Sequence, residues 1–448
     1  MSPSCLPASD PMRTLHRGAI AHCKGDPRLD TNHAQLIEDG ALVVEDGIVL
    51  AVGEADALLA RFPDAAVTTH AGILVPGFVD AHVHYPQLDM IASYGEQLLD
   101  WLERYTYPTE MRFGDPAHAA DVASRFVTEL LRNGTTTALV FCTVHPGSAD
   151  ALFTVAEQHD LCLIAGKVLM DRNAPDALLD SPERAYTESS ALIERWHGRG
   201  RLRYAVTPRF AVTSSPEQLD VASKLLREHE GLYLHTHLSE NPKEVAWVRE
   251  LFPERAGYLD VYDHHGLCGP RSVFAHGVHL TDAERATLAD KGAAIAFCPT
   301  SNLFLGSGLF DLAAAEASQV RVALGTDVGA GTSLSQLRTA GAAYQVLQLQ
   351  GQRLDPLRAL YLATLGGARA LYLDHRIGSF APGKDADFIV LDPAATPLLA
   401  HRTRGTSVEE QLFALFMLGD DRAVKQTFIR GRAVTVPAVS SRVADLRS

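Results

Sequence analysis

Short apolar runs recur along the middle of the chain, and longer segments with apolar residues at helical spacing separate them. Residues 116–132 and 216–229 show that helical spacing. Continuous apolar runs are typical of parallel strands that are buried on both faces. Eight such runs that alternate with helices predict an α/β fold, the (β/α)8 TIM barrel. The expected strands span residues 79–84, 136–141, 161–169, 203–208, 232–238, 272–277, 293–299 and 321–327.

The two ends of the chain have a different, β-rich pattern. Residues 41–45 and 48–52 are apolar and flank Asp46 and Gly47, which together are a strong signal for a β-hairpin. Neither end can bury a sheet face alone, so we expect one small β-sandwich domain that both chain ends build. At the C-terminal end the apolar runs are 386–391, 427–429 and 433–436, the last two on either side of a turn at 430–432. The expected divisions are 1–74 and 379–448 for the sandwich and 75–378 for the barrel.

Composition and charge narrow the possible partners. The chain has 448 residues, and 40 Lys and Arg against 54 Asp and Glu give a formal charge of −14. Such an acidic chain repels phosphate backbones and anionic lipids, so we expect neither nucleic acid nor a membrane as a partner. The six cysteines form no C-x-x-C pair and are expected as reduced thiols. Residues 1–18 lack an apolar core of signal-peptide length, which favours a soluble, cytoplasmic protein.

Polar residues gather where the expected strands end, and that edge of a TIM barrel is where active sites lie. His82 and His84 end the first strand, and alternation along a strand directs both imidazoles to one face. His237, His276 and Asp327 end three further strands. A single His-x-His pair is more often part of a core than a metal site. Together with the other three residues, however, it predicts a zinc or iron site in the barrel mouth.

A proton carrier is also needed for catalysis, and Glu240 follows His237 by three residues. An acidic residue there can serve a metal-bound water or a substrate ring nitrogen, or can simply stabilise the start of a helix. His235 points to the same face but one layer deeper, so we expect it to be a hydrogen-bonded core histidine. We expect His279 to be structural. Lys167 could be carboxylated and bridge two metals, but a structural or substrate-side lysine is favoured.

The strings PGFVDAHVH, HTHLSE, AHG and GTD, in that order, resemble the metal-dependent amidohydrolase superfamily. The resemblance covers most of the chain. It implies one zinc ion per chain, with iron as the other possibility, held by His82, His84, His237 and Asp327. It also implies that His276 orients the attacking water or the developing oxyanion, and that Glu240 is the proton shuttle. His276, Glu240 and Asp327 are therefore the expected catalytic residues.

Longer strings, above all HYPQLD, WLERYTYPTE and TPRF, resemble the purine-base deaminases of this superfamily. The resemblance implies guanine as the substrate, hydrolysed to xanthine and ammonia, and a homodimer. Gln87, Arg209 and Phe210 are expected to line the base pocket, where Arg209 offers a fork of donors and Gln87 can both donate and accept. A structural ion pair is the competing interpretation of Arg209. The same ligand would face His84, His237, Glu240 and Asp327.

Other functions stay open at this level. Related amidohydrolases deaminate adenosine-like thioethers or cytosine, or remove chloride from triazines, and a binuclear hydrolase of cyclic amides is a further alternative. A non-catalytic scaffold relative belongs to a different class. Such scaffolds typically lose metal ligands, and this chain keeps His82, His84, His237, Glu240 and Asp327. A metal-dependent deaminase is therefore the favoured hypothesis.

Overall fold

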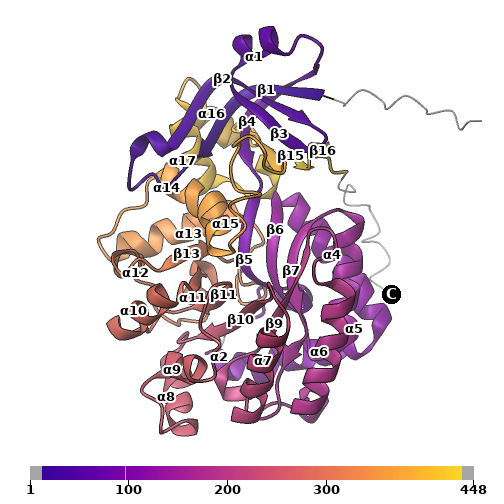
Figure 1. Ribbon diagram of the computed structural model, residues 1–448. Helices are drawn as coiled ribbons and strands as arrows, with labels where there is room; N and C mark the ends of the chain where they lie inside the picture. Colours follow the sequence, from indigo (N-terminus) through magenta and orange to yellow (C-terminus); the bar gives the residue numbers. More distant parts are fainter. Residues whose placement is uncertain (1–12, 96, 436–448) are drawn as a thin grey trace, which may run out of the picture.

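A computed structural model of the chain describes residues 13–95 and 97–435. Figure 1 shows a barrel with surrounding helices and, at one end, a smaller β unit in which strands from residues 13–76 and 388–433 lie side by side. The strands are β1 Arg13–Cys23, β2 Ala34–Glu45, β3 Ile48–Glu54, β4 Ala66–Pro76, β5 Phe78–His84, β6 Thr135–Phe141, β7 Cys162–Gly166, β8 Val168–Leu169, β9 Leu202–Pro208, β10 Tyr233–Leu238, β11 Ser272–His276, β12 Ala294–Phe297, β13 Arg321–Leu324, β14 Phe388–Leu391, β15 Val424–Ile429 and β16 Arg432–Ala433.

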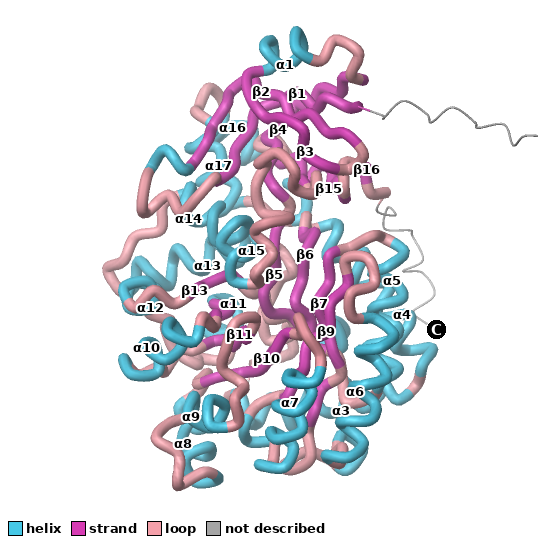
Figure 2. The backbone as a smooth tube through the Cα atoms, in the orientation of Figure 1, coloured by secondary structure: helices cyan, strands magenta, loops and turns pink. Residues whose placement is uncertain are grey.

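Most helices follow strands of the barrel and cover its outer face, whereas α1 packs on the β unit at the end of the molecule (Figure 2). Two π-helical segments, Leu102–Thr106 and Leu362–Gly366, interrupt α-helical stretches. The α-helices are α1 Ala55–Arg61, α2 Leu98–Trp101, α3 Tyr107–Met111, α4 Pro116–Arg132, α5 Pro146–Gln158, α6 Pro182–Trp196, α7 Pro216–Glu228, α8 Pro242–Leu251, α9 Tyr258–His264, α10 Asp282–Lys291, α11 Pro299–Phe304, α12 Leu312–Ala317, α13 Gln336–Leu349, α14 Pro356–Tyr361, α15 Gly367–Ala370, α16 Pro397–Thr403 and α17 Val408–Leu418.

The barrel prediction is confirmed. Within the described residues, eight parallel strands neighbour one another in the order β13-β12-β11-β10-β9-β7-β6-β5. The segment after β13 closes the ring against β5, because Asp327 N donates to His82 O at 2.8 Å and His84 N donates to Val328 O at 2.8 Å. The buried side chain of Asp80 reinforces this seam by accepting from Thr326 N at 3.0 Å. The seam therefore brings the ends of β5 and β13 to one place.

Local sequence chemistry explains where the barrel helices begin. Helix α4 starts after Asp115, whose side chain accepts a hydrogen bond from Ala117 N, and Pro116 occupies the first turn, where no amide donor is needed. Its buried face includes Val122, Phe126 and other apolar residues at helical spacing. Both α4 and α7 occupy the segments that the helical spacing predicts.

One expected strand, residues 161–169, is divided in the structure. β7 ends at Gly166, and β8 pairs separately with β9 after Lys167. The backbone N of Lys167 donates to the hydroxyl of Tyr204 at 3.3 Å, while the Val168 N–H bonds to Thr143 O at 2.9 Å. The strand is therefore divided at Lys167, where the backbone bonds to a side chain in place of a neighbouring strand. The pattern of apolar residues alone does not reveal this division.

The two chain ends share one mixed sheet, which in the described part of the chain has seven strands in the order β16-β15-β14-β4-β1-β2-β3. Asp46 and Gly47 form the expected turn between β2 and β3, both with positive φ, at 52° and 82°. The sheet curls back on itself, since Ile48 bridges to Asp385 just before β14. It encloses an apolar core with Phe388 among its members. The shared end domain is therefore confirmed, although Val436 of its last expected run lies outside the described residues.

Two further expectations concern cysteines and membranes. Every cysteine within residues 13–95 and 97–435 is a free, buried thiol, and Cys5 lies outside this part of the chain. No helix among the described residues combines the length and the apolar character that a membrane crossing requires.

Candidate active site

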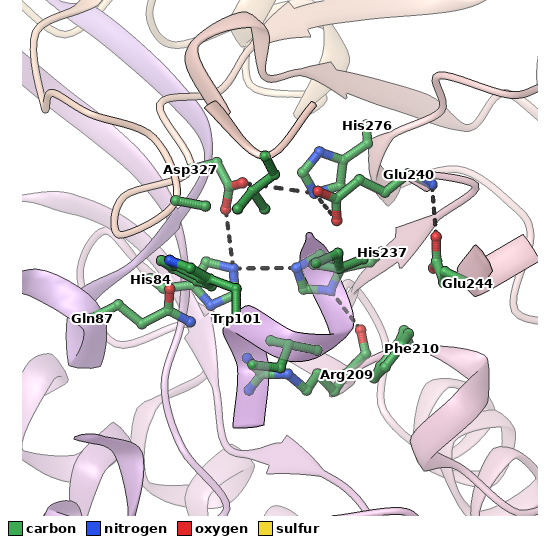
Figure 3. A pocket seen from close by; sticks show the side chains of 14 residues that line it. His84, Gln87, Trp101, Arg209, Phe210, His237, Glu240, Glu244, His276 and Asp327 are labelled. Carbon is green, nitrogen blue, oxygen red and sulfur yellow. Dashed lines mark hydrogen bonds and ion pairs between the residues drawn. The ribbon is translucent and has the colours of Figure 1, made fainter. Parts of the chain in front are cut away.

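Four imidazoles and one carboxylate converge at the C-terminal ends of the barrel strands. Figure 3 shows three of these imidazoles, those of His84, His237 and His276, together with Asp327. The ligand atoms of His82, His237, His276 and Asp327 all lie within 4.8 Å of one another. His84 Nε2 joins them, at 3.2 Å from His82 Nε2, 3.2 Å from His237 Nε2 and 3.3 Å from Asp327 Oδ1. The strands thus bring together all five groups that the sequence places at their ends.

Hydrogen bonds fix which imidazole nitrogen faces the centre. His237 Nδ1 donates to the backbone oxygen of Arg209 at 2.6 Å, so its Nε2 carries the lone pair that points toward His84. His82 Nδ1 lies 2.7 Å from Nε2 of the buried His235. Burial, followed by the charge of His82, lowers the pKa of His84 to about 3, and burial likewise holds the pKa of His237 well below its usual value. The two rings are therefore neutral near pH 7.

A cation placed among these neutral imidazole nitrogens, which lie 3.2 Å apart, would be bound by their lone pairs. Zinc in proteins is typically bound by such a set of donors, neutral imidazoles and an aspartate whose lone pairs face a common centre. The hydrogen bond from His237 Nδ1 to a carbonyl is the outer contact that metal-ligating histidines usually make. The geometry thus fits a metal ion.

His276 differs from the other imidazoles in how its ring is held. The side-chain amide Nδ2 of Asn302 lies 2.9 Å from His276 Nδ1, and an amide nitrogen can only donate. His276 Nδ1 is therefore the acceptor, and the ring carries its proton on Nε2. That nitrogen faces Glu240 Oε2 at 3.3 Å and Asp327 Oδ2 at 3.8 Å. In this tautomer His276 is a hydrogen-bond donor in the site and not a metal ligand.

Glu240 is buried, and its side chain and backbone are both fixed by neighbours. Ser307 Oγ donates to its Oε1 at 3.1 Å, and its backbone N–H donates to Glu244 Oε2 at 2.9 Å. Burial, followed by the negative charges of Asp327 and Glu244, raises the pKa of Glu240 well above its usual value. Glu240 is therefore suited to carry a proton at neutral pH.

Asp327 behaves in the opposite way. Burial alone would raise its pKa, but His82, His84 and His276 together hold that pKa well below the usual value. Its Oδ1 lies 3.1 Å from His82 Nε2. A permanently ionised carboxylate at this position can bind a cation through one oxygen and accept a proton at the other.

A cavity with an empty volume of about 410 Å³, including its open mouth, lies next to these groups. Gln87, Arg209 and Phe210 line it, as the sequence predicts, together with Trp101 and apolar residues (Figure 3). The indole Nε1 of Trp101 is buried and without a hydrogen-bond partner in the described structure. The remaining residues of the wall are His84, Leu98, Leu102, His237, Glu240, Glu244, His276, Leu305, Asp327 and Ala330.

Arg209 forms the structural ion pair that the sequence leaves open, and its position in the cavity wall is also compatible with a contact to a base. It lines the cavity, and its Nη1 also donates to the buried Glu110, at 2.7 Å to Oε2 and 3.0 Å to Oε1. Burial opposes the charge of Arg209, yet Glu110 and Tyr107 raise its pKa above the usual value. Arg209 therefore stays charged although its side chain is buried.

Three residues that the sequence places near the site form ion pairs or hydrogen bonds with other parts of the protein. Lys167 is fully buried and forms ion pairs with Asp180 and, at 2.8 Å, with Glu188, and it does not line the cavity. His235 is the buried hydrogen-bonding partner of His82. His279 contacts the backbone oxygen of Ser307 at 2.8 Å. The structural interpretation of these three side chains is thus the one that their contacts support.

Four supporting residues were not singled out from the sequence: Glu110, Glu244, Asn302 and Ser307. Glu110 lies within the string WLERYTYPTE, while Asn302 and Ser307 lie within residues 298–308. Nothing in the residue types alone pairs Glu110 with Arg209 or Asn302 with His276. Glu244 did carry a signal, since Asn241 and Glu244 at the start of α8 form a capping box.

The chain matches the model of the amidohydrolase family over residues 73–434, and that of an imidazolonepropionase-like composite domain of bacteria over residues 40–65. Guanine deaminase of Escherichia coli strain K12 is 53% identical over 403 residues, which cover 89% of this chain and 92% of that protein. Probable guanine deaminase of Deinococcus radiodurans is 44% identical, with coverage of 94% and 98%.

Solved structures agree with these sequence matches. The structure of E. coli guanine deaminase superposes with a TM-score of 0.92 at 50% identity, covering 94% of this chain and 99% of that one. Guanine deaminase from C. acetobutylicum, with guanine bound in its active site, gives 0.87 at 28% identity, with coverage of 94% and 100%. An adenosine deaminase from Xanthomonas campestris with bound zinc gives 0.84 at 26% identity, with coverage of 97% and 97%.

Proposed function

The chain belongs to the amidohydrolase family and, within it, to the guanine deaminases, and we propose that it hydrolyses free guanine to xanthine and ammonia in the mouth of its barrel. One observation supports this most strongly. A proton-carrying Glu240, an ionised Asp327 and clustered imidazoles adjoin a cavity whose polar wall is formed by Arg209 and Gln87. The site thus combines the groups for hydrolysis with groups that match the edge of a base.

The pocket wall complements the functional groups of guanine. Guanine presents a carbonyl oxygen at C6 and an N–H at N1 on one edge. The guanidinium of Arg209 can donate to the carbonyl, and the amide of Gln87 can donate and accept on the same edge. Phe210 supplies an apolar surface for the ring. A base held by that edge can direct C2, the carbon that carries the amino group, toward Glu240 and Asp327.

We propose that His82, His84, His237 and Asp327 hold one zinc ion per chain, with iron as the alternative. The amidohydrolase family is metal-dependent, and the zinc-bound relative shows that this fold accommodates the ion. His276 is left out of the proposed ligand set because its contact with the amide nitrogen of Asn302 favours a proton on Nε2. The ion would supply Lewis acidity, which lowers the pKa of a water molecule in contact with it from about 15.7 toward 7.

Asp327 and Glu240 then carry out the proton transfers, and His276 supplies a hydrogen bond. Asp327 takes a proton from the attacking water while Glu240 gives its own proton to N3 of guanine, the ring nitrogen next to C2 that lacks one. The donor His276 Nε2–H faces both carboxyl groups and stabilises the oxygen that adds to C2. When the C–N bond breaks, Asp327 returns its proton to the amino nitrogen, and Glu240 recovers one from the hydroxyl at C2. The products are xanthine and ammonia, and the protein is restored.

Ammonia release from a panel of guanine, adenine, cytosine and their nucleosides tests the proposed activity, with the metal content per chain measured on the same samples. We expect release from guanine well above that from every other member of the panel. Preferred release from another heterocycle would contradict the proposed substrate. Two metal ions per chain would contradict the mononuclear site.

Two expectations from the sequence stay predictions: a homodimer and a cytoplasmic location. Light scattering on the purified protein at several concentrations tests the first, and cell fractionation tests the second. Neither alters the residues proposed for the reaction, since every group named above belongs to one chain.

A further inference from the structure

We infer that Glu110 is a positioning residue of the base pocket, which fixes the amide of Gln87, balances the charge of Arg209 and so adapts the pocket to an uncharged purine. The inference rests on the proposed function, because it concerns how guanine is held and xanthine is released. Glu110 lies in α3 and is fully buried. It does not itself line the cavity, so it acts through the two residues that do.

Glu110 first fixes which way the side chain of Gln87 points. Gln87 Nε2 donates to Glu110 Oε1 at 3.0 Å, and on its other side Gln87 Oε1 accepts from Gly329 N at 3.2 Å. A flipped amide would set an oxygen against a carboxylate and an NH2 group against an N–H. A primary amide has two donors and two acceptor positions, so one of each remains for a base. These two hydrogen bonds therefore fix the orientation in which the amide of Gln87 faces a ligand.

Glu110 also holds the guanidinium of Arg209. Both hydrogen bonds use Nη1, at 2.7 and 3.0 Å, and the Nη2 and Nε donors are not needed for this pair. The Cζ atom of Arg209 lies 5.8 Å from the ring centre of Tyr107, another residue of α3. The same short helix thus fixes the guanidinium by a hydrogen-bonded ion pair and by an aromatic face. One carboxylate coordinates the two polar groups that are expected to contact the base edge.

The charge balance has a consequence for ligand choice. Arg209 without a counter-ion would attract anions strongly in a site that excludes water, because charges interact more strongly at low dielectric. With Glu110 attached, the pair is close to neutral. Guanine is uncharged near neutral pH, whereas xanthine, with a carbonyl in place of the amino group, loses a ring proton more readily. The Glu110–Arg209 pair therefore favours the substrate over the ionised product.

Replacement of Glu110 by Gln tests this inference, since Gln keeps the shape and removes the charge. Xanthine binding to the metal-loaded enzyme is measured by calorimetry at several pH values on both sides of neutrality, alongside kcat and KM for guanine. We expect the variant to bind xanthine about 10-fold more tightly at the alkaline end, as an unbalanced charged donor would. We also expect kcat/KM for guanine to fall about 100-fold, because an amide holds Gln87 and Arg209 less firmly in the orientation that the base requires than a carboxylate does.

A matched control is Glu157→Gln, which removes the carboxylate from an exposed pair with Arg199. It should leave xanthine binding and guanine turnover as in the unmodified chain. If Glu110→Gln binds xanthine with unchanged affinity and an unchanged pH profile, the inference is overturned. A purely structural Glu110 would lower the amount of folded protein without altering that profile.

A second comparison tests the inference even if Glu110→Gln fails to fold. Arg209→Gln keeps the carboxylate without the cation, and the double variant Arg209→Gln with Glu110→Gln lacks both charges. We expect the single variant to bind xanthine more weakly than the double variant as pH rises, because only the single variant repels the anion. Equal binding would overturn the inference. Calorimetry measures binding and needs no turnover. Failure of the unmodified chain to deaminate guanine would therefore contradict the proposed function without affecting this test.

Discussion

Glu240 and Asp327 are buried carboxyl groups of one pocket whose pKa values move in opposite directions. Asp327 has His82, His84 and His276 around it, and their influence outweighs burial and keeps it ionised. Glu240 meets burial first and then the charges of Asp327 and Glu244, so it retains a proton. Two carboxyl groups with separated pKa values are a way to run acid and base chemistry together at one pH. Asp327 is thus suited to the base role and Glu240 to the acid role.

Replacement of Glu240 by Gln removes the proton carrier and keeps the size of the side chain. We expect kcat to fall by about 10²- to 10⁴-fold, the usual contribution of general acid–base catalysis, with the metal content unchanged. Steady-state ammonia release and elemental analysis of the same preparation check both parts. Glu250→Gln, at an exposed position of the neighbouring helix α8, is the control. Full activity in Glu240→Gln would remove this residue from the mechanism.

At the residue scale, the sequence predicts the groups that meet at strand ends and misses the groups that hold them. His82 and His84 can be placed because alternation along a strand fixes their direction. Ser307 cannot be placed in the same way. Its contact with Glu240 spans 67 positions, and that of Arg209 with Glu110 spans 99 positions. Such pairs depend on how loops fold over the barrel mouth, which no local pattern encodes.

At the scale of elements, all eight expected strands are present in the described structure, one of them divided, because most of their residues are buried and apolar. The segment between β5 and α4 is different. It contains the short helices α2 and α3 with the π-helical turn Leu102–Thr106 between them. These short pieces carry Trp101 and Glu110 to the pocket, and they are too short for a periodic pattern to predict. The proposed base pocket thus draws on elements that local sequence patterns do not predict.

Lys167 shows how elements are tied together beneath the site. It lies between β7 and β8 and forms ion pairs with Asp180, just before α6, and with Glu188 within α6. Lys167→Met would leave these carboxylates without their buried partner. We expect the free energy of unfolding to fall by about 3–5 kcal/mol, the usual result of breaking a buried pair. Chemical denaturation and metal analysis are the measurements.

The exposed pair of Lys224 with Glu228 gives the control, because its two atoms lie 3.9 Å apart and water screens their charges. Lys224→Met should change the free energy of unfolding by no more than about 0.5 kcal/mol. Unchanged metal content in Lys167→Met agrees with the structural interpretation of Lys167. Loss of a metal ion in that variant would instead support the hypothesis that Lys167 is a carboxylated lysine that bridges two metals.

At the scale of the whole molecule, the shared sheet joins the two chain ends and fastens them to the barrel. Arg201, just before β9, forms a buried ion pair with Asp387, just before β14. Thr427 Oγ1 in β15 donates to Leu131 O in α4 at 2.7 Å. The sequence predicts the pairing of the chain ends because neither end can bury a sheet face alone. The fastening contacts are single polar residues, which composition and periodicity do not distinguish from others.

His22 links the N-terminal part of that sheet to the C-terminal part of the chain and should make the fold sensitive to acid. Its Nδ1 accepts from Phe380 N at 3.3 Å, and its Nε2 lies 3.1 Å from Gln35 Oε1, which accepts the Nε2 proton. A proton added at Nδ1 would face the Phe380 N–H. Burial in the first place lowers the pKa of His22 from 6.5 to about 4. The folded protein thus resists a charge that the unfolded chain accepts readily.

Because the folded pKa is depressed, the unfolded state binds a proton first as pH falls. The contribution of His22 to stability is therefore present above pH 6.5 and is lost progressively between pH 6.5 and about 4, up to about 3 kcal/mol. The metal site also loses its ligands in acid, so the thermal midpoint is compared between the unmodified chain and His22→Gln across this range. We expect a shallower decline in the variant, and the same decline as the unmodified chain in His401→Gln, at an exposed position of α16. Parallel declines in all three proteins would assign the acid sensitivity to other groups, because only the first substitution removes a buried imidazole from the junction of the chain ends.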